Sequence, residues 1–254
     1  MTTVTGSNAT LRDTLQPRAR GRGATDGAHR RASSATRPVV RGKFLFVGDT
    51  KYWVKGVTYG TFGPDADGHP FPGPAQAERD FAQMAQAGIN TVRVYTPPRR
   101  WLLDLALRHG LRVMVGLPWE QHIAFLDDPA RADAIVARLG ADVRASAGHP
   151  AVLCYAVGNE IPAGIVRWHG RGRIERFLER LYRAAKREDP DALVTYVNFP
   201  TTEYLRLPFL DFFCFNVYLE SRDRLEAYLA RRTGEADDAD AVNVFQSRGT
   251  FPGD

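Results

Sequence analysis

Short apolar runs and longer amphipathic segments follow one another along the chain in a regular order. The short runs are rich in β-branched residues, which is typical of strands buried on both faces, and the longer segments repeat apolar residues at helical spacing. The predicted strands cover residues 54–59, 91–95, 111–117, 152–160, 193–197 and 209–217. The predicted helices cover residues 77–87, 99–109, 132–147, 173–187 and 224–232. A hairpin over residues 43–54, which turns at residues 48–51, precedes the first core strand.

This alternation predicts an α/β fold with parallel strands, because strands joined through helices pair by right-handed crossovers. A closed (β/α)8 TIM barrel and an open doubly wound sheet both satisfy the pattern. A doubly wound sheet concentrates its chemistry at one switch point, and no Gly-rich phosphate loop follows the first core strand. Polar or aromatic residues instead follow nearly every predicted strand. We therefore predict a TIM-barrel type of fold, in which all strands end at one mouth.

The barrel is expected to be incomplete. Six clear strand–helix units occupy residues 53–232, whereas eight such units need about 250 residues. A doubtful seventh strand is expected at residues 241–245, and an eighth is absent. Such a barrel has open edges through which chains can associate. A truncated or frame-altered gene product and a divergent, non-catalytic protein are the two explanations that the sequence leaves open.

Residues 1–42 form an Arg-rich segment that differs from the rest of the chain. It holds eight arginines against two aspartates and has almost no large apolar residue before Val39. We expect a disordered tail here, followed by a TIM-barrel domain over residues 43–254 that is incomplete at its C-terminal end. The tail is a plain solvated extension, an arm that binds RNA or anionic lipid, or a targeting segment. The remaining residues carry a net charge of −1, so no nucleic-acid partner is expected for the folded part.

The composition further limits the kinds of protein to which this chain can belong. No apolar run approaches the length of a membrane span. Cys154 and Cys214 fall inside predicted strands and are expected to be small buried residues rather than a disulfide. No spacing of metal ligands occurs, and neither a metal nor a cofactor is expected. The sequence leaves the localisation unknown, with the cytoplasm as the default.

The stretch Val152–Glu160 contains the strongest candidate for catalysis. A buried apolar run ends in Gly158, Asn159 and Glu160, and the Ile-Pro pair that follows stops the strand. The strand therefore delivers a carboxyl group to the rim of the sheet, where parallel α/β proteins bind their ligands. We predict that Glu160 is a catalytic acid/base. A rim salt bridge or a helix-capping position is the alternative.

Four motifs resemble those of the clan A glycoside hydrolases. They are Lys55-Gly56-Val57-x-Tyr59, Gly88-Ile89-Asn90-Thr91-Val92-Arg93-Val94-Tyr95, Gly158-Asn159-Glu160 and Asn216-x-Tyr218. The resemblance covers about residues 43–232. It is nearest to the barrel domain of the β-galactosidase/β-glucuronidase family and to the β-1,3-glucanosyltransferases. It implies a retaining (β/α)8 enzyme that acts on an oligo- or polysaccharide.

The resemblance also implies a role for each matched residue. Glu160 is then the general acid/base, Asn159 bonds the sugar 2-hydroxyl, and Arg93 lies beside the nucleophile and keeps it ionised. The expected substrate-binding residues are Tyr59, Tyr95, Trp119, Asn216 and Tyr218. Retaining hydrolysis needs two carboxyl groups about 5–5.5 Å apart, one of them protonated, and partial removal from water favours the protonated form. Rim packing of the aromatic rings and a structural ion pair of the arginine are the alternatives.

The chain departs from the clan pattern at the nucleophile, which in the clan is a Glu at the end of strand seven. Gln246 falls near that position, and an amide is a poor nucleophile. Glu120, Glu220 and Glu235 do not match the motif. The sequence therefore predicts a retaining glycoside hydrolase impaired by the missing nucleophile. A carbohydrate-binding pseudoenzyme, a β-glucan transglycosylase and a binder of RNA or membranes through the tail are the alternatives.

Overall fold

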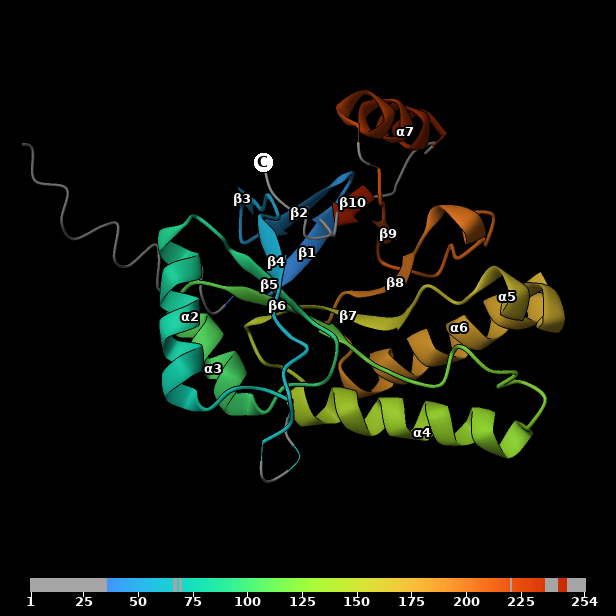
Figure 1. The fold of residues 1–254 in the computed structure, drawn as a ribbon, viewed down its shortest axis with the longest axis horizontal. Helices are drawn as coiled ribbons and strands as arrows, with labels where there is room; N and C mark the ends of the chain where they lie inside the picture. Colours follow the sequence, from blue (N-terminus) through green and yellow to red (C-terminus); the bar gives the residue numbers. More distant parts are fainter. Residues whose placement is uncertain (1–35, 66–67, 69, 220, 236–241, 246–254) are drawn as a thin grey trace, which may run out of the picture.

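The centre of the molecule is a parallel sheet that curls into a half-barrel, as in an incomplete TIM barrel (Figure 1). The computed structural model describes residues 36–65, 68, 70–219, 221–235 and 242–245. Its seven strands follow the order β10-β9-β8-β7-β6-β5-β4, so strands that are consecutive along the chain are neighbours in space. The predicted α/β fold of TIM-barrel type is confirmed.

All neighbouring strands of this sheet pair in parallel. The strands are β4 (Gly56–Thr58), β5 (Thr91–Val94), β6 (Arg112–Gly116), β7 (Val152–Asn159), β8 (Val194–Asn198), β9 (Phe213–Asn216) and β10 (Val242–Phe245). The doubtful seventh strand is present as β10, which lies in register with β9 from Val242 beside Phe213 to Phe245 beside Asn216. An eighth parallel strand does not occur among the described residues.

Helices cover the convex face of the half-barrel (Figure 1). They are α2 (Pro74–Gln86), α3 (Arg100–Arg108), α4 (Pro129–Ser146) and α6 (Arg171–Glu188). Their apolar residues and the outward side chains of the strands form the main core, which includes Phe81, Leu102, Ile135 and Phe177. Helix α4 starts three residues before its predicted start, because the side chain of Asp128 caps the backbone N–H groups of Ala130 and Arg131.

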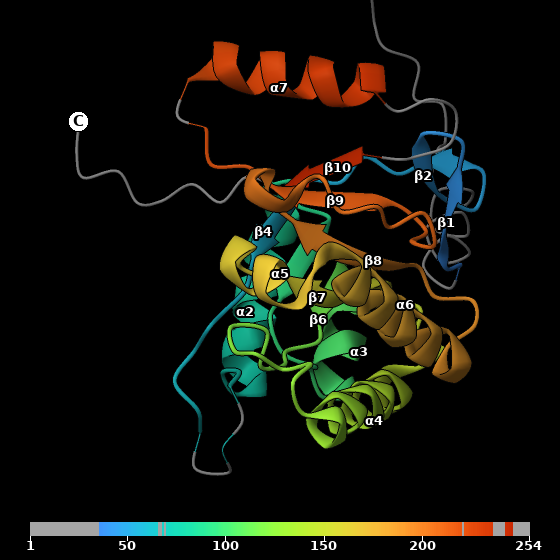
Figure 2. The same ribbon diagram turned by 90° about the vertical axis from the view of Figure 1, so that its right-hand side faces the viewer.

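The segments that follow β7, β8 and β9 differ from a regular barrel. A short helix that the sequence pattern did not predict, α5 (Ala163–His169), follows β7, and only a 3₁₀ turn (Pro200–Thr202) follows β8. Helix α7 (Arg222–Glu235) lies apart from the other helices, beside β9 and β10 (Figures 1 and 2). No helix of the described ranges combines the length and the apolar character needed to cross a bilayer.

A separate antiparallel sheet covers the face of the central sheet that is opposite the helices, near the N-terminal ends of the parallel strands. Strands β1 (Pro38–Arg41), β2 (Phe44–Val47) and β3 (Thr50–Lys51) form it. The predicted hairpin is present, but its turn is only residues 48–49, its second strand is Thr50–Lys51 rather than residues 52–54, and β1 was not predicted. Leu45 packs there with residues of the central strands that include Met114 and both cysteines. Cys154 and Cys214 are buried free thiols, as predicted.

The tail predicted to end at residue 42 contains part of this structure. Pro38–Arg41 pairs with β2, and the guanidinium of Arg37 donates hydrogen bonds of 2.6 and 2.9 Å to the carboxylate of Asp189. Asp189 is only 4% exposed, and a buried carboxylate needs such a partner. The ordered domain therefore begins before the predicted boundary, while residues 1–35 lie outside the described residues.

Candidate active site

Polar side chains from three strands meet at the carboxyl ends of the sheet. The Arg93 guanidinium, from β5, donates through Nη1 to Oδ1 of Asn216 on β9 at 2.8 Å. Its Nη2 donates to Oδ1 of Asn159 on β7 at 2.6 Å. The amide Nδ2 of Asn216 also donates to Oδ1 of Asn159 at 3.1 Å. Arg93 is 7% exposed, so a buried cation is held here by two neutral amides.

Glu160 follows β7 directly and turns its carboxylate toward the same group. Its Oε1 accepts a hydrogen bond from Nδ2 of Asn216 at 2.6 Å and one from the hydroxyl of Tyr218 at 2.8 Å. We call Arg93, Asn159, Glu160, Asn216 and Tyr218 the Glu160 cluster. Residues that the sequence spreads over 126 positions are thus brought to one mouth by the parallel sheet.

The backbone of Glu160 adopts a left-handed conformation, with φ of +50°. This conformation costs a non-Gly residue roughly 1–2 kcal/mol, and it persists where the surroundings hold it. Here the Glu160 N–H donates to the carbonyl of Val197, and the next N–H, of Ile161, donates to the buried hydroxyl of Tyr196. Burial, with a contribution from the charge of Glu160, raises the pKa of Tyr196, which keeps this phenol neutral. Outliers of this kind cluster at functional sites.

A residue outside the sequence prediction fixes the position of Asn159. The side chain of Gln121, in the loop after β6, accepts from the Asn159 N–H at 3.0 Å and donates to the Asn159 carbonyl. Gln121 is 8% exposed, so these bonds hold the end of β7 rigidly. The only signal in the sequence was that Gln121 comes shortly after the third predicted strand. Trp119 and Glu120 share that position, so it did not single out Gln121.

Two of the predicted aromatic residues lie at the mouth with exposed rings. Tyr95 is 38% exposed, and the guanidinium carbon of Arg93 lies 4.8 Å from its ring centroid. Tyr218 is 55% exposed and contacts Glu160 through its hydroxyl. Both rings are open to a ligand that approaches the Glu160 cluster.

Two other predicted aromatic residues are buried instead. Tyr59 is 4% exposed, and its hydroxyl donates to Asp80 of α2 at 2.7 Å. Trp119 is 8% exposed, its Nε1 donates to the carbonyl of Val157, and its ring packs against Phe125 and Phe177. Both side chains turn toward the helices rather than the mouth, so neither offers a stacking face to a ligand.

Other described polar side chains at or after the strand ends have structural partners. Glu120 is bonded to Arg138 of α4 at 2.7 Å, a contact that lowers the pKa of the Glu120 carboxyl. Asn198 accepts from the N–H of Phe199 and bonds Thr202, so it caps the 3₁₀ turn after β8. Glu220, Gln246 and the side chain of Glu235 lie outside the described residues. Within the described ranges, no carboxylate forms an ion pair with Arg93, and no three potential metal ligands come together.

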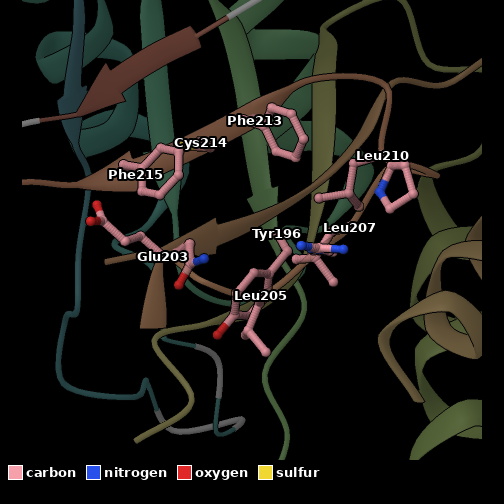
Figure 3. Close-up of a pocket in the computed structure, with 11 residues that line it drawn as sticks. Tyr196, Glu203, Leu205, Leu207, Leu210, Phe213, Cys214 and Phe215 are labelled. Carbon is pink, nitrogen blue, oxygen red and sulfur yellow. The ribbon is translucent and has the colours of Figure 1, made fainter. Parts of the chain in front are cut away.

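A cavity of about 550 Å³ beside β8 and β9 is separate from this site (Figure 3). It is lined mainly by apolar side chains, among them Leu205, Leu207, Leu210 and Phe213. Only the 3₁₀ turn and a loop connect β8 to β9, so no α-helix fills this part of the outer face. None of the five residues of the Glu160 cluster lines the cavity, which therefore does not belong to the candidate active site.

A half-barrel with a carboxyl group, an amide and a buried arginine at the mouth of its parallel strands is the arrangement that the sequence motifs predicted for a glycoside hydrolase barrel domain. Residues 40–236 match the family described as glycosyl hydrolases family 2, TIM barrel domain. The chain belongs to this family. Its resemblance to the β-galactosidase/β-glucuronidase barrel is thereby confirmed.

Individual relatives agree with this assignment. A β-galactosidase from Arthrobacter sp. (strain B7) is 31% identical over 99 residues, which cover 35% of this chain and 10% of that protein. The structure of β-glucuronidase 2 from Bacteroides uniformis matches with a TM-score of 0.66 and 18% identity over 81% of this chain. The β-glucuronidase from Faecalibacterium prausnitzii matches with a TM-score of 0.61 and 22% identity over 79% of this chain. The chain covers only 26% and 35% of these two solved chains, and at such identities they show the fold.

Proposed function

We propose that the chain carries the acid/base part of a retaining glycoside hydrolase site, with Glu160 as the general acid/base and a β-galactoside or β-glucuronide as substrate. The observation that carries this proposal is the position of the Glu160 carboxylate, held by Asn216 and Tyr218 beside the Arg93–Asn159 pair. The substrate class follows from the names of the relatives, which include a β-galactosidase and β-glucuronidases.

The geometry suits proton transfer to a leaving oxygen. Both hydrogen bonds to Glu160 end on Oε1, and no described residue donates to Oε2. The second oxygen is therefore the one that carries the proton to the glycosidic oxygen, while the bond from that oxygen to the anomeric carbon breaks and a nucleophilic carboxylate bonds that carbon. When water then displaces the nucleophilic carboxylate from the anomeric carbon, the Glu160 carboxylate takes a proton from the water. If a sugar hydroxyl attacks instead of water, the same step gives transglycosylation.

Arg93 marks the place of a second, ionised carboxyl group. It is a buried cation whose hydrogen-bond partners among the described residues are neutral amides, although buried charges are normally paired. A carboxylate beside it would be kept ionised, as the nucleophile of retaining hydrolysis requires. In this chain β10 is followed by Gln246, which cannot fill that role. The proposed enzyme is therefore impaired in its covalent step.

Hydrolysis of 4-methylumbelliferyl β-galactoside and β-glucuronide tests the proposal. Glu160→Gln keeps the shape and removes the acid, so we expect the rate to fall by roughly 10²–10⁴-fold. Glu120→Gln is the matched control, because Glu120 bonds α4 and not the cluster, and it should leave the rate unchanged. An unchanged rate in Glu160→Gln, with measurable wild-type turnover, would refute the assignment of Glu160.

A carbohydrate-binding protein without turnover is the second candidate. The hydrogen bonds of Arg93 favour it, because the polar and aromatic side chains at the mouth are present while no described carboxylate pairs with this cation. Calorimetric binding of methyl β-galactoside or methyl β-glucuronide, with no release of 4-methylumbelliferone from the corresponding glycosides, would select this candidate over the enzyme.

A further inference from the structure

The exposed large apolar side chains of the described residues fall in two places. One group lies on the antiparallel sheet, the linker after it and β4, and comprises Val39, Phe44, Trp53 and Val57. The other group, which we call the rim arc, comprises Tyr95, Ile123, Trp168, Tyr204 and Tyr218. Each member of the rim arc follows a different strand, from β5 to β9 in order. Since the carboxyl ends of these strands share one mouth, the rim arc lies at the same mouth as the Glu160 cluster, and Tyr218 belongs to both.

Trp168 is the most exposed member of the rim arc, at 69%. It lies eight residues beyond Glu160, in the last turn of α5, and Figure 2 shows α5 beside the ends of β7 and β8. Its indole Nε1 donates to the carboxylate of Asp127, in the loop after β6, at 2.7 Å. The edge of the ring is therefore fixed while its surface stays open to solvent.

The helix that carries Trp168 is also held firmly by its neighbours. The neighbouring His169 is buried, and its Nε2 accepts from the N–H of Leu126. Arg173 of α6 donates to the carbonyl of Leu126 at 2.7 Å. These contacts tie α5, α6 and the loop after β6 to one another. A large apolar ring that is exposed yet held in place loses little further entropy when a ligand covers it, which favours binding.

We propose that the rim arc binds successive sugars of a β-linked oligosaccharide, and that Trp168 is the platform for a sugar beyond the one at Glu160. The inference rests on the proposed function and adds to it a binding position for a second sugar, at a residue that the sequence analysis did not single out. The apolar C–H face of a sugar ring matches an exposed indole, and its hydroxyl edge stays in water. The rim arc has one large apolar side chain per loop, and four of the five are aromatic. Single rings at such intervals fit a chain of sugars better than they fit a protein partner, which needs a contiguous apolar face.

Binding as a function of ligand length tests this proposal. Calorimetry would compare tetrasaccharides with their methyl monoglycosides, in a β-1,4-galactosyl series and a β-1,3-glucosyl series. For a series that binds, we expect Trp168→Ala to weaken binding of the tetrasaccharide by roughly two- to tenfold, as the loss of one aromatic stacking contact implies. Binding of the methyl monoglycoside should not change, and Trp168→Phe should recover part of the loss.

Trp53→Ala is the matched control, because Trp53 is 62% exposed but precedes β4, at the opposite end of the strands. It should leave both ligands unaffected. A folded Trp168→Ala variant that binds the tetrasaccharide as tightly as the wild type would overturn the proposal. Monoglycoside binding that Glu160→Gln reduces, without any gain from chain length, would overturn it while the proposed function stands. If the wild type binds neither these oligosaccharides nor methyl β-galactoside nor methyl β-glucuronide, both proposals fail.

Discussion

The carboxylate of Glu160 and the amide of Asn216 lie 2.6 Å apart, although 56 positions separate them along the chain. One amide thus serves two charged groups, because its nitrogen donates to Glu160 and its oxygen accepts from Arg93. Asn can do both at once, whereas Asp lacks the donor and Leu lacks both. Asn216 is therefore the link between the proposed acid/base and the buried cation.

Replacing this link should impair the site more than the fold. We expect Asn216→Ala to weaken binding of methyl β-galactoside or methyl β-glucuronide, whichever the wild type binds, by about tenfold or more, since a hydrogen bond to a charged group contributes roughly 1.5–3 kcal/mol. Calorimetry measures the effect. Asn198→Ala is the control at the end of the neighbouring strand, where the amide serves only the 3₁₀ turn. Equal losses of affinity in both variants would show that the Asn216 effect is not specific to the site.

A carboxylate supplied at the end of β10 should restore activity. Gln246 comes directly after Phe245, whose Cα is in register with that of Asn216. If the missing nucleophile limits turnover, Gln246→Glu should raise hydrolysis of the 4-methylumbelliferyl glycosides at least tenfold over the wild type. The double variant Gln246→Glu with Glu160→Gln should lose this gain. A single variant that binds the methyl glycosides but remains as slow as the wild type would argue against Gln246 as the position of the lost nucleophile.

Gly158 should be intolerant of a side chain. A Cβ at this position would lie 3.2 Å from the ring of Tyr196 and 3.3 Å from that of Trp119, both of which are buried. We expect Gly158→Ala to lower the free energy of unfolding by about 1–3 kcal/mol, as overpacking does, and to displace Asn159 and Glu160. Urea unfolding followed by circular dichroism measures it. Gly164→Ala in α5 meets no atom within 4 Å and should change stability by less than about 1 kcal/mol.

Stability should depend on pH through His169. Burial lowers the pKa of His169 below its ordinary 6.5, the charge of Asp127 partly opposes this shift, and Arg173 adds to it. The unfolded chain then binds the proton more readily than the folded one, so the stabilisation is full above pH 6.5 and is lost as the pH falls through the folded pKa. Urea unfolding should give a lower free energy of unfolding at pH 5.5 than at pH 7.5. The difference between the two pH values should be smaller in the His169→Gln variant. The exposed His122, replaced in the same way, should leave the pH dependence intact.

Local patterns were sufficient for the order of strands and helices. Whether a segment forms a strand or a helix depends here on the apolar pattern within about ten residues. Strands β5, β6, β7 and their helices therefore lie close to their predicted positions. The same holds for Glu160, because a strand that ends in a carboxylate places it at the rim in any parallel barrel. Helix α5 was not predicted, because a helix of seven residues is too short to show the repeated apolar spacing by which helices are recognised.

Long-range packing decided the rest of the site. Tyr59 and Trp119 follow strands just as Tyr95 does, but contacts with Asp80 and Phe177 in the helical layer turn the first two away from the mouth. The hydrogen bonds between Gln121 and Asn159 join the loop after β6 to the end of β7, and neither local sequence indicates this pairing. The sequence by itself thus determined the fold class and the acidic residue at the mouth. Only the tertiary structure decided which side chains face that mouth, because the direction of a side chain after a strand depends on neighbours that are distant in the chain.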